Sequence, residues 1–184
     1  LWRSDYQCTA DFKPESNQYQ NVTYGIWAPF TGTGTGRAIG DTYRIRSSYA
    51  PALTTNYIFS VDEKLPDDQE MVDWLKKYCV EYKTVRPYLS CDLYPLTSVT
   101  SDRGATMAVQ YDRPESKDGI VQIFRRDDSP YPSIILTLEA LSDSKRYMLT
   151  DADSGETFTI SGKEEFEIKM PEKRTAKLYF YQEV

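Results

Sequence analysis

Phe166-Glu167-Ile168-Lys169-Met170 decides the fold of the C-terminal part, because apolar and charged side chains alternate along it. Successive side chains of a β-strand point to opposite faces, so this alternation predicts a strand with one buried face and one face in water. Leu178 and Phe180 repeat the pattern near the end of the chain. The stretch therefore predicts β-structure in this region.

Working back from this stretch, short candidate strands separated by turn-forming residues fill residues 104–184. The predicted strands are residues 107–111, 119–125, 134–141, 146–150, 156–160, 166–170 and 176–181. Short strands at such regular spacing predict a small antiparallel β-sandwich.

One connection in this region resembles an ion-binding loop. Asp151-Ala152-Asp153-Ser154-Gly155-Glu156 begins like a calcium loop, but its glycine comes one place early and the closing glutamate is missing. The sequence therefore predicts a hairpin turn here rather than a metal site.

Composition excludes several kinds of chemistry. The chain has no histidine, and Cys8, Cys79 and Cys91 form no Cys-x-x-Cys pair, so histidine-based catalysis and zinc sites are not expected. A Cys79–Cys91 bridge and two buried thiols remain alternatives. No cofactor is predicted.

The charge balance argues against two classes of partner. Lys and Arg number 22 against 28 Asp and Glu, a net charge of −6, which argues against nucleic acid and anionic membranes. No apolar run approaches the roughly 20 residues that span a bilayer.

A helix is predicted over residues 66–86, where apolar residues recur at helical spacing and Pro87 ends the pattern. Asp67 and Asp68 suit its N-cap. The glycines of residues 31–36 fit neither nucleotide-binding motif and predict a loop.

Three other N-terminal segments are read as strands. Residues 1–6 look like a buried strand that ends in a carboxylate, which suggests a piece of something larger. The first half of residues 17–30 could form one or two helical turns, residues 25–30 look like a second buried strand, and residues 43–48 look like a third strand or a strand-end loop. Arg44 and Arg46 would then point to one side, where they bind a ligand or form salt bridges to acidic loops.

Several motifs follow one another along nearly the whole chain: Leu1-Trp2-Arg3-Ser4-Asp5-Tyr6-Gln7, Asn17-Gln18, Tyr24-Gly25-Ile26-Trp27-Ala28-Pro29, Tyr43-Arg44-Ile45-Arg46-Ser47-Ser48, Met107-Ala108-Val109-Gln110-Tyr111-Asp112-Arg113-Pro114-Glu115, Phe124-Arg125-Arg126 and Tyr147-Met148-Leu149-Thr150-Asp151. In this order they resemble the retaining α-galactosidases of glycoside hydrolase family thirty-six.

The resemblance implies an α/β plus all-β chain. Residues 1–103 would be the C-terminal part of a TIM-type (β/α)8 barrel, and residues 104–184 a small antiparallel β-sandwich. Ser4-Asp5 matches the family's motif at the end of the sixth barrel strand, which makes Asp5 the general acid/base. Trp2, Trp27, Arg44 and Arg46 are candidates for lining the substrate pocket. Read without the family, Asp5 is an ordinary aspartate that caps a loop.

The chain also departs from the family. The nucleophile's Lys-Trp-Asp context is absent, since Asp73-Trp74 has the reverse order inside the predicted helix. Retaining glycosidases need two carboxyl groups, so the chain by itself is predicted to be inactive. The expected partners are an α-galactoside-type carbohydrate and the remaining barrel strands or a second copy of the chain. The alternative is a non-catalytic carbohydrate-binding or structural module.

Overall fold

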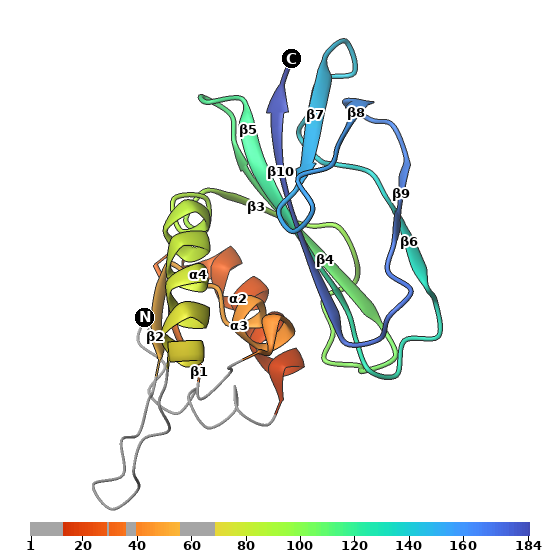
Figure 1. Ribbon diagram of the computed structural model, residues 1–184. Coiled ribbons are helices and arrows are strands. Elements are labelled where there is room, and N and C mark those ends of the chain that lie inside the picture. Colours follow the sequence, from red (N-terminus) through yellow and green to blue (C-terminus); the bar gives the residue numbers. More distant parts are fainter. Residues whose placement is uncertain (1–12, 29, 36–39, 56–68) are drawn as a thin grey trace, which may run out of the picture.

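The computed structural model describes residues 13–28, 30–35, 40–55 and 69–184 (Figure 1). In this part of the chain the structure is mostly antiparallel β-sheet with few helices. The helices are α2 (Pro14–Trp27), α3 (Thr42–Ser47) and α4 (Gln69–Val85). None of the helices in the described ranges has the length and apolar composition needed to cross a membrane.

The strands form three sheets. β1 (Gly32–Thr35) and β2 (Ala52–Thr55) pair in parallel, while the other two sheets are antiparallel. The large sheet has the order β3-β4-β5-β10-β7-β8, and β6 pairs with β9. These strands are β3 (Asp92–Pro95), β4 (Thr106–Arg113), β5 (Asp118–Arg125), β6 (Ser133–Leu136), β7 (Arg146–Asp151), β8 (Thr157–Ser161), β9 (Phe166–Lys169) and β10 (Thr175–Glu183).

The predicted sandwich strands are confirmed, each overlapping one strand from β4 to β10. The alternation that predicted β9 is real, since Phe166 and Ile168 are buried while Glu167 and Lys169 are exposed. The buried side chains pack with Val121 and other apolar residues of the large sheet, so the β6–β9 pair covers one of its faces.

The helices cover the other face of the large sheet (Figure 1). For this reason β4 and β5 are buried on both sides: Ala108 faces the β6–β9 pair, whereas Met107 and Val109 pack with helical residues such as Val22. Within the described residues, the helices, the six-stranded sheet and the β6–β9 pair thus form three successive layers, with the six-stranded sheet in the middle.

The helix predicted over residues 66–86 is confirmed as α4, which ends at Val85 before Pro87. Its buried residues, Tyr78 and Val85, belong to the cluster on the helical face of the sheet. The suggested N-caps, Asp67 and Asp68, lie outside the described residues.

Three predictions for the N-terminal segments are wrong. Residues 25–27 continue α2, and residues 43–47 form α3, whose N-cap Asp41 accepts a hydrogen bond from the Arg44 N–H at 2.9 Å. The predicted glycine loop contains β1, whose threonines suit a strand once β2 pairs with it. The segment after Pro87 also contains β3, which was not predicted.

Amide side chains hold α2 against the segment of α3. Asn17 Nδ2 donates to Ser48 Oγ at 3.1 Å, and Gln18 Nε2 donates to Ser47 Oγ at 2.9 Å. Asn21 Nδ2 donates to the Ser47 carbonyl at 3.1 Å. Because α2 buries these polar residues, its packing face lacks the apolar stripe by which helices are recognised.

Candidate functional site

The residues predicted to form the site are only partly described. Asp5 and Trp2 lie outside the described residues, so their roles remain predictions. Trp27 is the last residue of α2 and is 87% exposed. It precedes β1, on the N-terminal side of that strand, whereas sites in parallel α/β folds gather at the C-terminal strand ends. Its substrate-binding role remains a prediction that this placement does not support.

Arg44 and Arg46 do not share one side, as a strand would have placed them. On a helix with 3.6 residues per turn, two residues two positions apart point about 200° apart. Arg44 is partly buried beside a polar pocket, whereas Arg46 is buried between the layers, with 2% of its side chain exposed.

The Arg46 guanidinium is occupied by two carboxylates. It donates to both oxygens of Glu81 at 2.9 and 2.8 Å, and to both oxygens of Asp153 at 2.9 and 2.7 Å. It also donates to the Ala176 carbonyl at 3.0 Å. Burial alone would lower the pKa of Arg46, but the hydrogen bonds to Glu81 and Asp153 outweigh it and raise the pKa above its ordinary value. Of the two roles expected for Arg46, the salt bridge to an acidic loop is the one observed.

Asp153 belongs to the acidic turn between β7 and β8, where a hairpin turn was predicted and is found. In this turn Asp151 accepts hydrogen bonds from Lys177 Nζ at 2.6 Å and from the Asp153 N–H at 2.8 Å. No group of three or more potential metal ligands occurs among the described residues.

A groove between the helices and the large sheet contains two polar pockets that share Arg174. The first, the Asp41 pocket, has a volume of about 560 Å³ and is lined by residues 40–43, Asp153 and residues 174–176. Asp41 begins the helix that follows β1, and helices in βα units begin at the C-terminal ends of the strands. The groove is therefore the candidate functional site in the described part of the chain.

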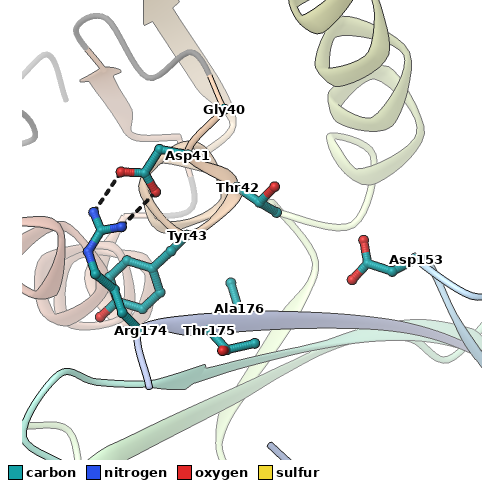
Figure 2. Close-up of a pocket in the computed structure, with 8 residues that line it drawn as sticks. All are labelled: Gly40, Asp41, Thr42, Tyr43, Asp153, Arg174, Thr175 and Ala176. Carbon is teal, nitrogen blue, oxygen red and sulfur yellow. Dashed lines mark hydrogen bonds and ion pairs between the residues drawn. The ribbon is translucent and has the colours of Figure 1, made fainter. Parts of the chain in front are cut away.

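Arg174 closes the Asp41 pocket on one side (Figure 2). Its guanidinium donates to both carboxylate oxygens of Asp41, at 3.0 and 2.6 Å, and lies 5.0 Å from the centre of the Tyr43 ring. The backbone φ of Arg174 is 54°, in the left-handed region that residues other than glycine rarely adopt. The paired contacts with Asp41 and Tyr43 help to hold this conformation.

The second, the Lys13 pocket, has a volume of about 410 Å³. It is lined by residues 13–16 at the start of α2, Arg44, Ser101, Arg103, Asp127 and Arg174. Tyr43 connects the two pockets, because its hydroxyl donates to Glu15 Oε1 at 2.9 Å. Burial, together with the nearby Glu15 charge, raises the pKa of Tyr43 above its ordinary value, so Tyr43 stays a neutral donor.

Among the charged residues that line the groove, Arg44 was predicted from the sequence to bind substrate, and Asp153 was assigned to a hairpin turn. Asp41 carried only a partial signal, since aspartate suits an N-cap but the residues that follow it are mostly strand formers. Lys13, Arg103 and Arg174 carry no local signal, because three-dimensional folding alone brings their separate segments together.

The comparisons with known proteins show a similarity of fold to solved structures. No protein-family model matches the sequence, and no curated protein matches it. Among solved structures, the galactosidase domain of an α-galactosidase–sucrose kinase aligns with 94% of this chain and 25% of its own, with a TM-score of 0.60 and 13% identity. The α-galactosidase from Lactobacillus brevis aligns with 85% of this chain and 23% of its own, with a TM-score of 0.58 and 15% identity.

These values define a shared fold. The chain spans about a quarter of the length of the two solved structures, and the likeness extends over nearly all of the chain. The fold is therefore one that occurs within α-galactosidases.

Proposed function

We propose that the chain is the C-terminal part of a retaining α-galactosidase-like glycoside hydrolase of family thirty-six, running from the sixth barrel strand to the C-terminal β-sandwich. The observation that carries this proposal is the fold shared with two α-galactosidase structures over 94% and 85% of the chain. The order β1-α3-β2-α4, with β1 and β2 parallel, also suits the end of a (β/α)8 barrel.

In this proposal Asp5 is the general acid/base, which protonates the leaving oxygen and then activates water. Retention also requires a carboxylate nucleophile about 5–5.5 Å from the acid, and the sequence offers no match to the family's nucleophile motif. The 184-residue chain would therefore be inactive, and the barrel strands that complete it, or a second copy, would be its partners.

The first test compares two proteins: the 184-residue chain, and the longest open reading frame that contains it. Each is assayed with p-nitrophenyl α-galactoside and with an α-galactosyl disaccharide. We expect no turnover by the short chain and hydrolysis by the longer one. Turnover by the short chain that Asp5→Asn abolishes would contradict the proposed inactivity, and the absence of a Lys-Trp-Asp strand upstream would contradict the family.

The second test assigns Asp5 in the longer protein. General acid catalysis supplies about 10²–10⁴-fold, so Asp5→Asn should lower the rate on the disaccharide by that range. Nitrophenolate leaves without protonation, so the rate of bond cleavage on the nitrophenyl substrate should fall less. Asp73→Asn, on the exposed face of α4, is the matched control and should leave both rates unchanged. Equal rates for Asp5→Asn and wild type would remove Asp5 from the mechanism.

The alternative, a carbohydrate-binding β-sandwich, receives no support from the aromatic residues of the sandwich. Sugar platforms need exposed rings, yet across residues 104–184, all of them described, Tyr131 is the one fully exposed aromatic side chain. The abundant tyrosines of this region, such as Tyr179 and Tyr181, are core residues.

A further inference from the structure

The Lys13 pocket concentrates positive charge in an acidic chain. Lys13, Arg44, Arg103 and Arg174 reach it from four separate segments, while among the described residues two carboxylates, those of Glu15 and Asp127, line it. The whole chain carries a net charge of −6, so this lining has the opposite sign to the molecule as a whole.

The two carboxylates in the lining already have donors. Glu15 accepts the Tyr43 hydroxyl at 2.9 Å, and Asp127 accepts Arg103 Nη2 at 3.0 Å. Asp41 and Asp128 pair with Arg174 and Arg103 respectively, but neither of them lines the pocket. Within the described ranges Lys13 has no ion-pair partner, so its ammonium group remains available to a ligand.

The start of α2 adds to this field. Residues 13–16 line the pocket, and the N-cap residue Lys13 makes no side-chain cap to the helix. The N-terminus of a helix of this length carries a partial positive charge and N–H groups that suit an anion. Both the side chains and the backbone at this end therefore favour negative charge.

A buried arginine next in sequence to the pocket lining also favours a bound anion. Arg126 has 0% exposure, and its guanidinium donates to Gln18 Oε1 at 3.0 Å, the Asp102 carbonyl at 2.6 Å and Met107 Sδ at 3.2 Å. None of these acceptors is a carboxylate, and burial lowers the pKa of Arg126, although nearby negative charges, that of Glu15 among them, partly offset the effect. A buried cation without a bonded counter-charge is costly, and an anion bound nearby would reduce that cost.

We infer that the Lys13 pocket binds an oxyanion, a carboxylate or a phosphate ester, carried by a small molecule such as an acidic sugar. The volume of about 410 Å³ suits a ligand of monosaccharide size, and the position between two layers is typical of small-molecule sites. Guanidinium groups match the geometry of carboxylate and phosphate oxygens. The inference does not depend on the proposed hydrolysis, because it rests on described residues alone and its ligand is an anion rather than a galactoside.

Isothermal titration calorimetry of the 184-residue chain tests the site, with inorganic phosphate and galacturonate as probes and galactose as the neutral comparison. We expect at least one anion to bind, with affinity falling as salt rises, and galactose not to bind. Binding of galacturonate alone would indicate an acidic sugar, and binding of phosphate alone a phosphate ester.

Charge variants should change the affinity for the anion in opposite directions. Lys13→Gln and Arg44→Gln should each weaken anion binding about tenfold, the equivalent of 1.4 kcal/mol. Asp127→Asn should strengthen it several-fold, because it removes a competing carboxylate. Lys163→Gln, an exposed lysine in the sandwich, is the control and should have no effect.

Two results would overturn the inference: no binding of either anion at millimolar concentration, or binding that Lys13→Gln leaves unchanged. Lys13 is exposed, so its substitution tests binding even where Arg44→Gln impairs folding. A polar cavity of purely structural character would not give opposite changes in affinity for Lys13→Gln and Asp127→Asn.

Discussion

The two faces of the six-stranded sheet are closed in different ways. The face under the β6–β9 pair is packed chiefly through apolar side chains such as Leu149, although it also buries Arg125, which donates to the Met170 carbonyl at 2.7 Å. The face under the helices combines an apolar cluster with buried amides, hydroxyls and two buried arginines, Arg46 and Arg126.

The two faces therefore depend on different contributions to stability, namely apolar packing on one side and buried polar contacts on the other. Apolar contacts tolerate small shifts, and each loss is proportional to the atoms removed. Buried polar groups contribute little when they are satisfied, but they cost the full desolvation penalty when a partner is lost. The helical layer is therefore held in one orientation by polar contacts, and the loss of a single partner should be costly. The candidate site lies at the edge of that layer.

Arg46→Ala should cause the largest loss of stability, on the helical face of the sheet. It leaves the partly buried Glu81 without its guanidinium partner, and removing one side of a buried pair costs about 3–5 kcal/mol. Urea unfolding of Arg46→Ala, with Lys163→Ala as the exposed control, measures this cost. A loss below about 1 kcal/mol would mean that the Arg46 network contributes little to the free energy of unfolding.

Leu149→Ala tests the apolar face. Leu149 has 0% exposure in the sandwich core, and truncating a buried leucine to alanine costs about 2–5 kcal/mol. Leu149→Met, which nearly conserves volume, should cost less than about 1.5 kcal/mol. If Met and Ala destabilised this face equally, its packing would depend on exact shape rather than on apolar volume.

Gly119→Ala should destabilise by a smaller amount. A Cβ at this position would clash with the Tyr181 hydroxyl and the Tyr111 carbonyl, where that hydroxyl approaches Asp112. Overpacking of this kind costs about 1–3 kcal/mol. Gly155→Ala tests a glycine at which an added Cβ would meet no atom within 4 Å but the backbone φ is 73°, and it should cost less. Thermal unfolding of both variants gives the comparison.

The sandwich could be predicted because its strands carry their own signal. In β9 the buried and exposed residues alternate as the sequence does, and α4 likewise shows its apolar face and its proline stop. For α2 the sequence indicated only one or two helical turns, since this helix packs through Asn17, Gln18 and Asn21 rather than through an apolar stripe. β1 can be recognised as a strand only from its pairing with β2 in the structure.

The candidate site was less predictable than the fold, for a physical reason. The pairs that define it join distant parts of the chain: Asp41 with Arg174, and Arg46 with both Glu81 and Asp153. Charged residues show no periodicity that would reveal such partners. Arg44 and Arg46 were predicted to point to one side of a strand, but they lie on α3, where they point in different directions.

The smallest expected effect is on the pH dependence of the free energy of unfolding. Burial raises the pKa of Asp112, with smaller contributions from Asp92 and Asp118, while the hydrogen bond from Tyr181 opposes the rise. For Asp151, burial acts in the same direction, but the hydrogen bond from Lys177 and those from the backbone outweigh it and lower the pKa.

The two carboxyl groups should therefore give opposite slopes. A raised pKa in the folded state means that the stabilising contribution of Asp112 is fully present below the unfolded pKa of about 4 and is lost as pH rises through the folded value. The contribution of Asp151 is present above about pH 4 and is lost as pH falls through its lowered folded pKa. Urea unfolding of Asp112→Asn and Asp151→Asn between about pH 3 and pH 7 measures both. Relative to wild type, the free energy of unfolding of Asp112→Asn should be higher at pH 7 than at pH 3. That of Asp151→Asn, again relative to wild type, should be lower at pH 7 than at pH 3. The same slope in both variants would show that burial, rather than the particular partners, sets the charge of these two aspartates.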